Sequence, residues 1–260
     1  MEGHKTLFSL AIFLLANDKS FWFLPFNLSN SLIINSFVSM NSKRAKKILD
    51  KTVLDYNSIA DKYSRVREKD WREFDFLFAQ YLSVNDKVLD LGCGNGRFYP
   101  PFQKKNVDYL GIDVSSNLID IAKIKYPEAR FEVSSIEMMG DKTFDKVYSI
   151  AVLHHIPSYD LRLKFLKEIK RTLKYNGILI LTVWNLKEKL KKRSLLDWFK
   201  MDKGDVLLPW YGSKDTYFHC FNLEELIQLI KEAGFEIIDR GEILVGEKPY
   251  SNFYIVGKNI

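Results

Sequence analysis

A short apolar run leads directly into a glycine-rich loop at residues 87–96, KVLDLGCGNG. This junction is typical of a strand that turns tightly into a helix, because glycine lets the backbone turn sharply and approach a ligand. Strand-like and helix-like segments then alternate toward the C-terminus. Such alternation predicts an α/β fold with a mainly parallel twisted sheet flanked by helices, and it places ligands at the carboxyl ends of the strands.

Apolar periodicity sets the expected elements. The predicted strands are 87–91, 109–113, 130–133, 144–150, 177–184, 236–245 and 252–257. The predicted helices are 43–63, 71–81, 98–105, 117–125, 161–173 and 223–233. Residues at about 185–220 are expected to form an irregular insertion over the carboxyl edge of the sheet.

The composition changes abruptly at Met40. The basic stretch SKRAKKILDK follows at residues 42–51. The apolar run 7–16 is too short to span a bilayer as a helix, so no stable membrane span is expected. Its flanks differ from those of a signal peptide. We therefore expect 1–39 to be an extension upstream of the true start at Met40, with a weak interfacial anchor as the alternative. One domain is expected at 40–260.

Composition narrows the class of protein. Hydrophobic residues make up 47% and charged residues 28%, which allows a large core and argues against wholesale disorder. The net charge of +6 favours anionic partners such as RNA or an acidic membrane surface, although Lys-rich enzymes are equally basic. Cys93 and Cys220 have neither metal-ligand spacing nor a disulfide pattern, so reduced thiols in a cytoplasmic protein without a metal site are expected.

The glycine loop also restricts the ligand. A dinucleotide fingerprint needs a third glycine at position 97, where this chain has Arg97. An acidic residue before the glycines, Asp90, suits a ligand with a positive amino-acid end. Asp113 ends the next predicted strand and can accept both hydroxyls of a ribose. These residues indicate a nucleoside that carries an ammonium group and no phosphate.

This set of features resembles the Rossmann-like class I methyltransferases over about residues 84–184. The resemblance implies S-adenosyl-L-methionine as the cofactor and a methyltransferase domain at 40–260. In this family an Asp often lies beside the adenine, and here Ser135 takes that place while Ile136 can flank the ring. The implied cofactor-binding residues are Asp90, Gly92, Gly94, Gly96, Asp113, Ser135 and Ile136.

A narrower resemblance involves DYNSIADKYSRVREKDW (55–71), SIAVLHHI (149–156) and DVLLPW (205–210). These stretches are similar to the eukaryotic-type tRNA wobble-uridine methyltransferases, which esterify 5-carboxymethyluridine, and the similarity covers most of 53–258. It implies the tRNA anticodon loop as a partner and a small zinc-binding activator subunit, as in those relatives. Similar openings also occur in small-molecule methyltransferases.

The chemistry of that reaction limits the expected site. A carboxylate is already ionised at neutral pH, so it needs alignment with the methyl group and no general base. We therefore expect few positive contacts, from His155 and Arg67 as catalytic residues, and aromatic rings that hold the base. The predicted substrate-binding residues are Tyr56, Trp71, Trp184, Trp210 and His219.

Two basic clusters, 43–47 and 187–193, fit an RNA backbone, although both could be ordinary solvated helix faces. Two other functions stay open from the sequence. One is an O-methyltransferase for a phenol or quinone precursor, in which His155 would act as the general base. The other is a non-catalytic subunit that binds the cofactor and supports a partner.

Overall fold

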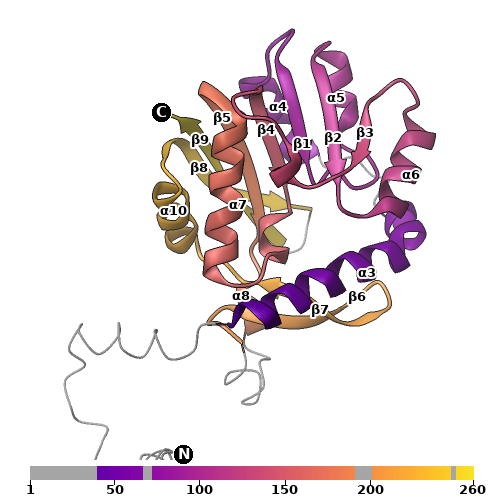
Figure 1. The fold of residues 1–260 in the computed structure, drawn as a ribbon, viewed down its shortest axis with the longest axis vertical. Helices are drawn as coiled ribbons and strands as arrows, with labels where there is room; N and C mark the ends of the chain where they lie inside the picture. The colour runs from indigo at the N-terminus through magenta and orange to yellow at the C-terminus, as the bar shows by residue number, and fades with distance from the viewer. Residues whose placement is uncertain (1–39, 67–71, 191–200, 247–249) are drawn as a thin grey trace, which may run out of the picture. The chain divides into compact units, whose positions relative to one another are not determined.

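The computed structural model describes residues 40–66, 72–190, 201–246 and 250–260, which belong to the compact unit Met40–Ile260. Its strands form a seven-stranded sheet in the order β3-β2-β1-β4-β5-β9-β8 (Figure 1). β1 to β5 are parallel, while β9 pairs antiparallel with both β5 and β8. The strands are β1 (Lys87–Leu91), β2 (Asp108–Asp113), β3 (Phe131–Val133), β4 (Phe144–Ile150), β5 (Leu173–Trp184), β8 (Phe235–Val245) and β9 (Tyr250–Asn259). The predicted α/β fold is confirmed.

The helices begin at local signals in the sequence. The side chains of Ser115, Ser158 and Asn222 cap α6, α7 and α10 by accepting backbone N–H groups of the first turn. The α-helices are α3 (Ser42–Val66), α4 (Asp75–Tyr81), α5 (Tyr99–Lys104), α6 (Ser116–Lys125), α7 (Tyr159–Thr172), α8 (Lys187–Leu190) and α10 (Leu223–Glu232). Short 3-10 helices are η2 (Arg72–Phe74), η3 (Ile136–Met138) and η4 (Leu153–His155).

The central strands are buried on both faces, which explains their nearly continuous apolar runs. One apolar cluster joins alternate residues of the strands to α7 and α10, through side chains such as Leu166 and Leu229. A second cluster joins the other residues to α4, α5 and α6, and it is rich in aromatic rings. Phe78 stacks on Tyr148 there, with ring centroids 5.1 Å apart. The sheet is therefore the middle layer of three.

The insertion was expected to be irregular, and the structure corrects this. Its described part contains α8 and an antiparallel hairpin of β6 (Asp205–Trp210) and β7 (Ser213–His219). Pro209 within β6 and the exposed Leu207 hid the strand pattern, since proline is rare inside strands and apolar residues normally face inward. Val206 and Phe218 are buried and hold the hairpin to the domain.

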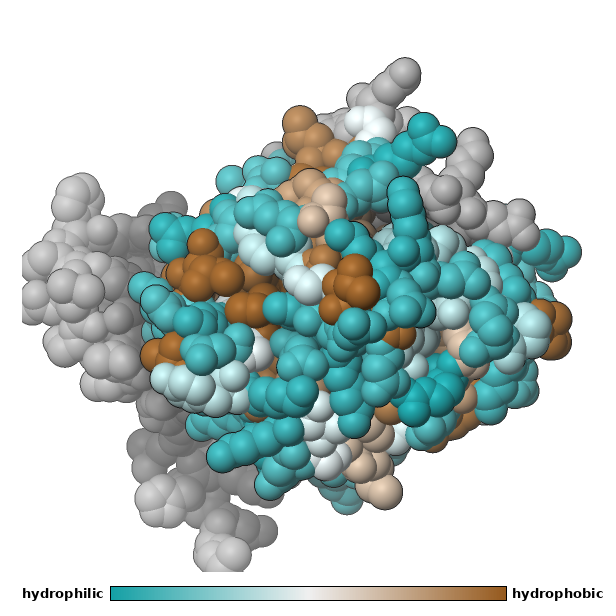
Figure 2. Space-filling view, turned by 90° about the horizontal axis from the view of Figure 1, so that it is seen from above, coloured by the Kyte–Doolittle hydropathy of each residue, from teal (hydrophilic) through white to brown (hydrophobic). Residues whose placement is uncertain are grey.

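α3 lies beside the hairpin at the carboxyl ends of the parallel strands, at the bottom of Figure 1. The opposite face, seen from above in Figure 2, is largely hydrophilic with small separate apolar patches. None of the helices in the described ranges is both long enough and apolar enough to cross a bilayer. α3 therefore lies at the edge of the sheet where parallel α/β folds bind ligands.

Candidate active site

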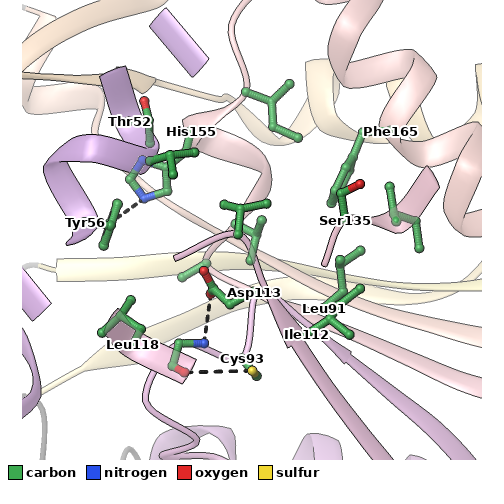
Figure 3. Close-up of a pocket in the computed structure, with 18 of the residues that line it drawn as sticks. Thr52, Tyr56, Leu91, Cys93, Ile112, Asp113, Leu118, Ser135, His155 and Phe165 are labelled. Atoms are coloured by element: carbon green, nitrogen blue, oxygen red, sulfur yellow. Dashed lines mark hydrogen bonds between the residues drawn. The ribbon is translucent and has the colours of Figure 1, made fainter. Parts of the chain in front are cut away.

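A cavity of about 350 Å³ lies at the carboxyl ends of the parallel strands, between the glycine loop and α3 (Figure 3). This volume is within the range of small-molecule sites. Side chains and backbone from widely separated elements line it, including Tyr56, Gly92, Asp113, Ser135 and His155. The cavity is where a cofactor and the reacting part of a substrate could meet.

The glycine loop follows β1 and bends through backbone angles that favour glycine. Gly92, Gly94 and Gly96 have φ angles of +77°, +54° and +71°. A Cβ atom on Gly92 would lie 2.3 Å from a methyl carbon of Val152, and one on Gly96 would lie 2.9 Å from the Phe131 ring. The loop therefore needs glycine for its conformation and for the space behind it. Gly92 and Gly94 line the cavity, whereas Gly96 packs behind it.

Asp113 ends β2 at the rim of the cavity. Its carboxylate accepts hydrogen bonds from the backbone N–H groups of Gly94 at 2.9 Å and Ser115 at 2.8 Å. Burial raises the pKa of this carboxyl group, while the backbone N–H groups act in the opposite direction. The two bonds fix the carboxylate beside the loop in an orientation suited to neighbouring hydroxyl groups.

The structure places Asp90, a predicted cofactor-binding residue, within β1. Its side chain is 2% exposed and does not line the cavity. It accepts a hydrogen bond from the hydroxyl of Tyr109 at 2.9 Å, and burial raises its pKa to about 7. The side chain of Asp90 is therefore bonded across from β1 to β2.

The far end of the cavity combines polar and apolar side chains, among them Ser135, Glu137 and Phe165. Ser135 and Ile136 line it at the start of η3, as does Phe165 from α7, which lies near Ser135 in Figure 3. Leu118 and Leu91 line the walls nearer the glycine loop. The apolar side chains among them could contact a flat ligand ring.

His155 makes two hydrogen bonds that define its protonation. Its Nδ1 lies 3.3 Å from the backbone carbonyl oxygen of Tyr217, and its Nε2 lies 2.9 Å from the hydroxyl of Tyr56. A carbonyl can only accept, so Nδ1 carries the proton and Nε2 accepts from Tyr56. Burial lowers the pKa of His155 to about 4, although the carbonyl opposes this shift. The ring is neutral at physiological pH.

Trp184 joins Tyr56 and His155 at the cavity wall. It stacks on His154 and Phe218 with centroid separations of 4.7 Å and 5.5 Å. Trp210 packs against Trp184 at 4.9 Å and does not line the cavity. Three of the residues expected on the substrate side therefore meet, and Trp210 supports them from behind.

His219 is also away from the cavity. It is fully buried, with Nδ1 2.7 Å from Asp205 and Nε2 2.8 Å from Glu225. His219 therefore joins the hairpin to α10 and does not face the cavity.

The sequence also predicted Arg67 and Trp71 at the site, and both lie outside the described residues.

Sequence reasoning missed the network around Asp205. The Asp205 carboxylate accepts a hydrogen bond from the Tyr217 hydroxyl at 2.6 Å and lies 3.9 Å from the buried guanidinium of Arg162. No local pattern joins these residues, because they come from three different elements. In the ranges that the structure covers, no cluster of three or more His, Cys, Asp or Glu side chains could hold a metal ion.

Comparisons with known proteins agree with this geometry. Residues 63–240 match a family described as a methyltransferase domain. A protein of Encephalitozoon cuniculi named as a methyltransferase is 30% identical over 72% of this chain and 87% of its own length. The tRNA (carboxymethyluridine(34)-5-O)-methyltransferase of Schizosaccharomyces pombe is 28% identical over 72% of this chain and 89% of its own. The crystal structure of an S-adenosylmethionine-dependent methyltransferase from Methanosarcina mazei is 26% identical, with a TM-score of 0.62, and covers 71% of this chain and 97% of that one.

Proposed function

Because this chain belongs to the family of S-adenosylmethionine-dependent methyltransferases, we propose that it esterifies the carboxylate of 5-carboxymethyluridine at the wobble position of tRNA. The Schizosaccharomyces pombe relative carries that activity in its name and aligns over most of its own length. The stretches 55–71, 149–156 and 205–210 resemble the same group of enzymes. The substrate is thus an RNA base with an acidic side chain.

The cavity fits S-adenosyl-L-methionine, the cofactor of the family. Gly92 and Gly94 line the cavity, so the backbone of the loop can contact the cofactor. In the proposal Asp113 accepts the ribose hydroxyls, while Ser135 and Ile136 flank the adenine. Asp90 and Gly96 act from behind, by supporting the loop. The bound cofactor supplies a methyl group on a positively charged sulfur.

The protonation state of His155 is the observation that favours a carboxylate as the nucleophile. Among the described residues that line the cavity it is the only imidazole, and both of its nitrogens face uncharged partners. A ring with a pKa of about 4 is a weak base near neutral pH. A carboxylate is already ionised and needs no base, so a weakly basic His155 is compatible with a carboxylate nucleophile. In the proposal Tyr56 and His155 contact the substrate as neutral side chains, and proton removal plays no part.

Aromatic side chains support an unpaired base. Trp184 is partly exposed at the cavity and is held by rings behind it. Bases of an anticodon loop can be splayed onto such rings, whereas bases in a duplex cannot. In the proposal Trp184 and Tyr56 hold the modified uridine, with Trp71 and Arg67 completing the site.

Basic residues would hold the RNA backbone. Lys43 and Lys47 are exposed on α3, and Lys187 is exposed on α8. Lys46 is also exposed but pairs with Asp50 at 3.1 Å. These lysines lie on elements near the cavity, at the carboxyl side of the sheet. Binding should therefore weaken steeply with added salt.

The direct test is an assay with purified protein, S-adenosylmethionine and tRNA that contains 5-carboxymethyluridine. Mass spectrometry of the nucleosides should show the methyl ester. Replacing Lys187, Lys189, Lys191 and Lys192 with Ala should reduce the slope of log affinity against log salt by about 3. Replacing Lys104, Lys105 and Lys142 with Ala at the opposite face should leave that slope unchanged. No ester from this tRNA, with methylation of a small phenol instead, would establish the alternative substrate class.

We also propose a small zinc-binding activator subunit as a partner, because the resembling tRNA enzymes use one. The expected result is a rise in tRNA methylation when a candidate activator is produced together with the chain. Full activity of the chain alone at saturating tRNA would rule out this requirement and leave the substrate proposal intact.

A further inference from the structure

Three consecutive residues of α3 contact three separate parts of the molecule. Successive side chains on a helix point about 100° apart, so a helix above a cavity can reach both rims and the interior. The Asp55 carboxylate accepts a hydrogen bond from the Thr216 hydroxyl of β7 at 3.2 Å. Tyr56 points to His155, as Figure 3 shows. Asn57 turns to the other rim, at the start of α6.

Asn57 makes a set of close polar contacts there. Its side-chain oxygen accepts from the Ser115 hydroxyl at 2.7 Å and from the Asn117 backbone N–H at 3.2 Å. Its backbone carbonyl accepts from the Asn117 side chain at 2.9 Å. Ser115 is fully buried, and its oxygen also accepts the Leu118 N–H as the cap of α6. These bonds fix α3 to the turn that begins α6.

The same turn holds Asp113. The backbone N–H of Ser115 donates to one carboxylate oxygen of Asp113 at 2.8 Å, while its side chain donates to Asn57. Asn57 itself does not line the cavity. Ser115 is therefore bonded on one side to the helix that covers the cavity and on the other to the carboxylate at its rim.

We propose that Asn57 is a positioning residue for the cofactor, which holds the turn 113–115 in the geometry that Asp113 needs. The inference rests on the proposed role of Asp113 at the ribose. Preorganisation of a binding group lowers the ordering cost that would otherwise reduce affinity. Without Asn57 the turn must be ordered when the cofactor binds. Because Tyr56 is the neighbouring residue on α3, the bond between Asn57 and Ser115 also fixes the position of Tyr56 relative to Asp113.

Calorimetric titration of the full chain with S-adenosylmethionine tests the inference without any RNA. Asn57→Ala should weaken binding about tenfold, as expected for the loss of one to two partly buried hydrogen bonds. Asn57→Asp keeps the accepting oxygen, and a negative charge suits the N-terminus of α6, so it should recover most of the affinity. Unchanged affinity in Asn57→Ala would overturn the proposal.

The matched control is Asp55→Ala on the opposite rim. It removes the bond to Thr216 and the ion pair with Lys51, and it should leave the affinity for the cofactor within about twofold of wild type. Equal weakening in both variants would mean that α3 acts only as a general support, which also overturns the proposal. A double-mutant cycle adds a second criterion: Asn57→Ala and Ser115→Ala should be non-additive, because they remove one shared bond.

Hydrogen exchange covers the case in which a variant folds poorly. The amides of 115–118 should exchange faster in Asn57→Ala than in wild type, and added cofactor should restore their protection. Exchange that is equally slow in both proteins contradicts the proposal. If the proposed role of Asp113 is itself wrong, Asp113→Ala should bind the cofactor with wild-type affinity. This result distinguishes that failure from a failure of the proposal for Asn57. Failure of the tRNA assay leaves these binding results unaffected.

Discussion

The proposed cofactor end and the proposed substrate end of the cavity are built in different ways. The cofactor end comes mainly from residues 90–118, two consecutive strand-to-helix turns whose backbone N–H groups hold Asp113. The substrate end joins Tyr56, His155, Trp184 and the hairpin, which are distant in sequence. The first depends mainly on local backbone conformation, with Asn57 of α3 as an added tertiary contact, and the second depends on tertiary packing.

This contrast extends to the groups that stabilise each end. Behind the substrate end, the Asp205 carboxylate is fully buried and contacts Arg162, Tyr217 and His219. Tyr217 in turn presents its carbonyl to His155. The position of His155 therefore depends on a buried charged network, whereas the position of Asp113 does not.

The largest expected effect comes from Asp205→Ala. Removal of one partner leaves Arg162 buried without its carboxylate, which should lower the free energy of unfolding by about 3–5 kcal/mol. Urea denaturation measures this change. Asp215→Ala, an exposed residue of the same hairpin, should change it by less than about 0.5 kcal/mol. Similar small changes in both variants would show that the network does not stabilise this end.

Gly92→Ala tests the cofactor end. The left-handed backbone and the close methyl group of Val152 should force the loop to shift, and the affinity for S-adenosylmethionine should fall about 100-fold. Gly246→Ala has a similar φ of +65° and, among the described residues, no atom within 4 Å of the new Cβ, so it serves as the control for backbone strain without a clash. If Gly92→Ala binds as tightly as Gly246→Ala, the loop does not approach the cofactor.

The same contrast decides what the sequence could predict. The bounds of β1 and β4 match the expected strands to the residue, because apolar runs and the glycine turn are local signals. The burial of Asp90 was not predictable, since it depends on Tyr109 of the neighbouring strand. The protonation of His155 was not predictable either, because the partner of its Nδ1 lies 62 residues further along the chain.

A smaller effect is expected from pH. The pKa of His155 is about 4 in the folded protein, below its ordinary value near 6.5. Its contribution to stability is therefore present above pH 6.5 and is lost as the pH falls through 4. With saturating tRNA, kcat should be flat from about pH 6 to 9, and His155→Gln should lower it less than about tenfold. A steep loss of kcat below pH 7 that His155→Gln abolishes would instead identify a general base.

The smallest effect is expected from removal of residues 1–39. The backbone N–H of Met40 already bonds to the Asp202 carboxylate at 2.7 Å, within the unit Met40–Ile260. A protein that begins at Met40 should therefore unfold within about 1 kcal/mol of the full chain and bind the cofactor equally well. Loss of solubility or of cofactor affinity would contradict the proposed domain boundary.

The most direct test of two separable ends is calorimetric titration of S-adenosylmethionine into Asp113→Ala and Asp205→Ala. A carboxylate that accepts ribose hydroxyls contributes about 1.5–3 kcal/mol, so Asp113→Ala should bind about 10- to 100-fold more weakly. Asp205→Ala, measured at a temperature where it is folded, should bind within about twofold of wild type. Wild-type affinity in Asp113→Ala, or an equal loss in both variants, would contradict the account.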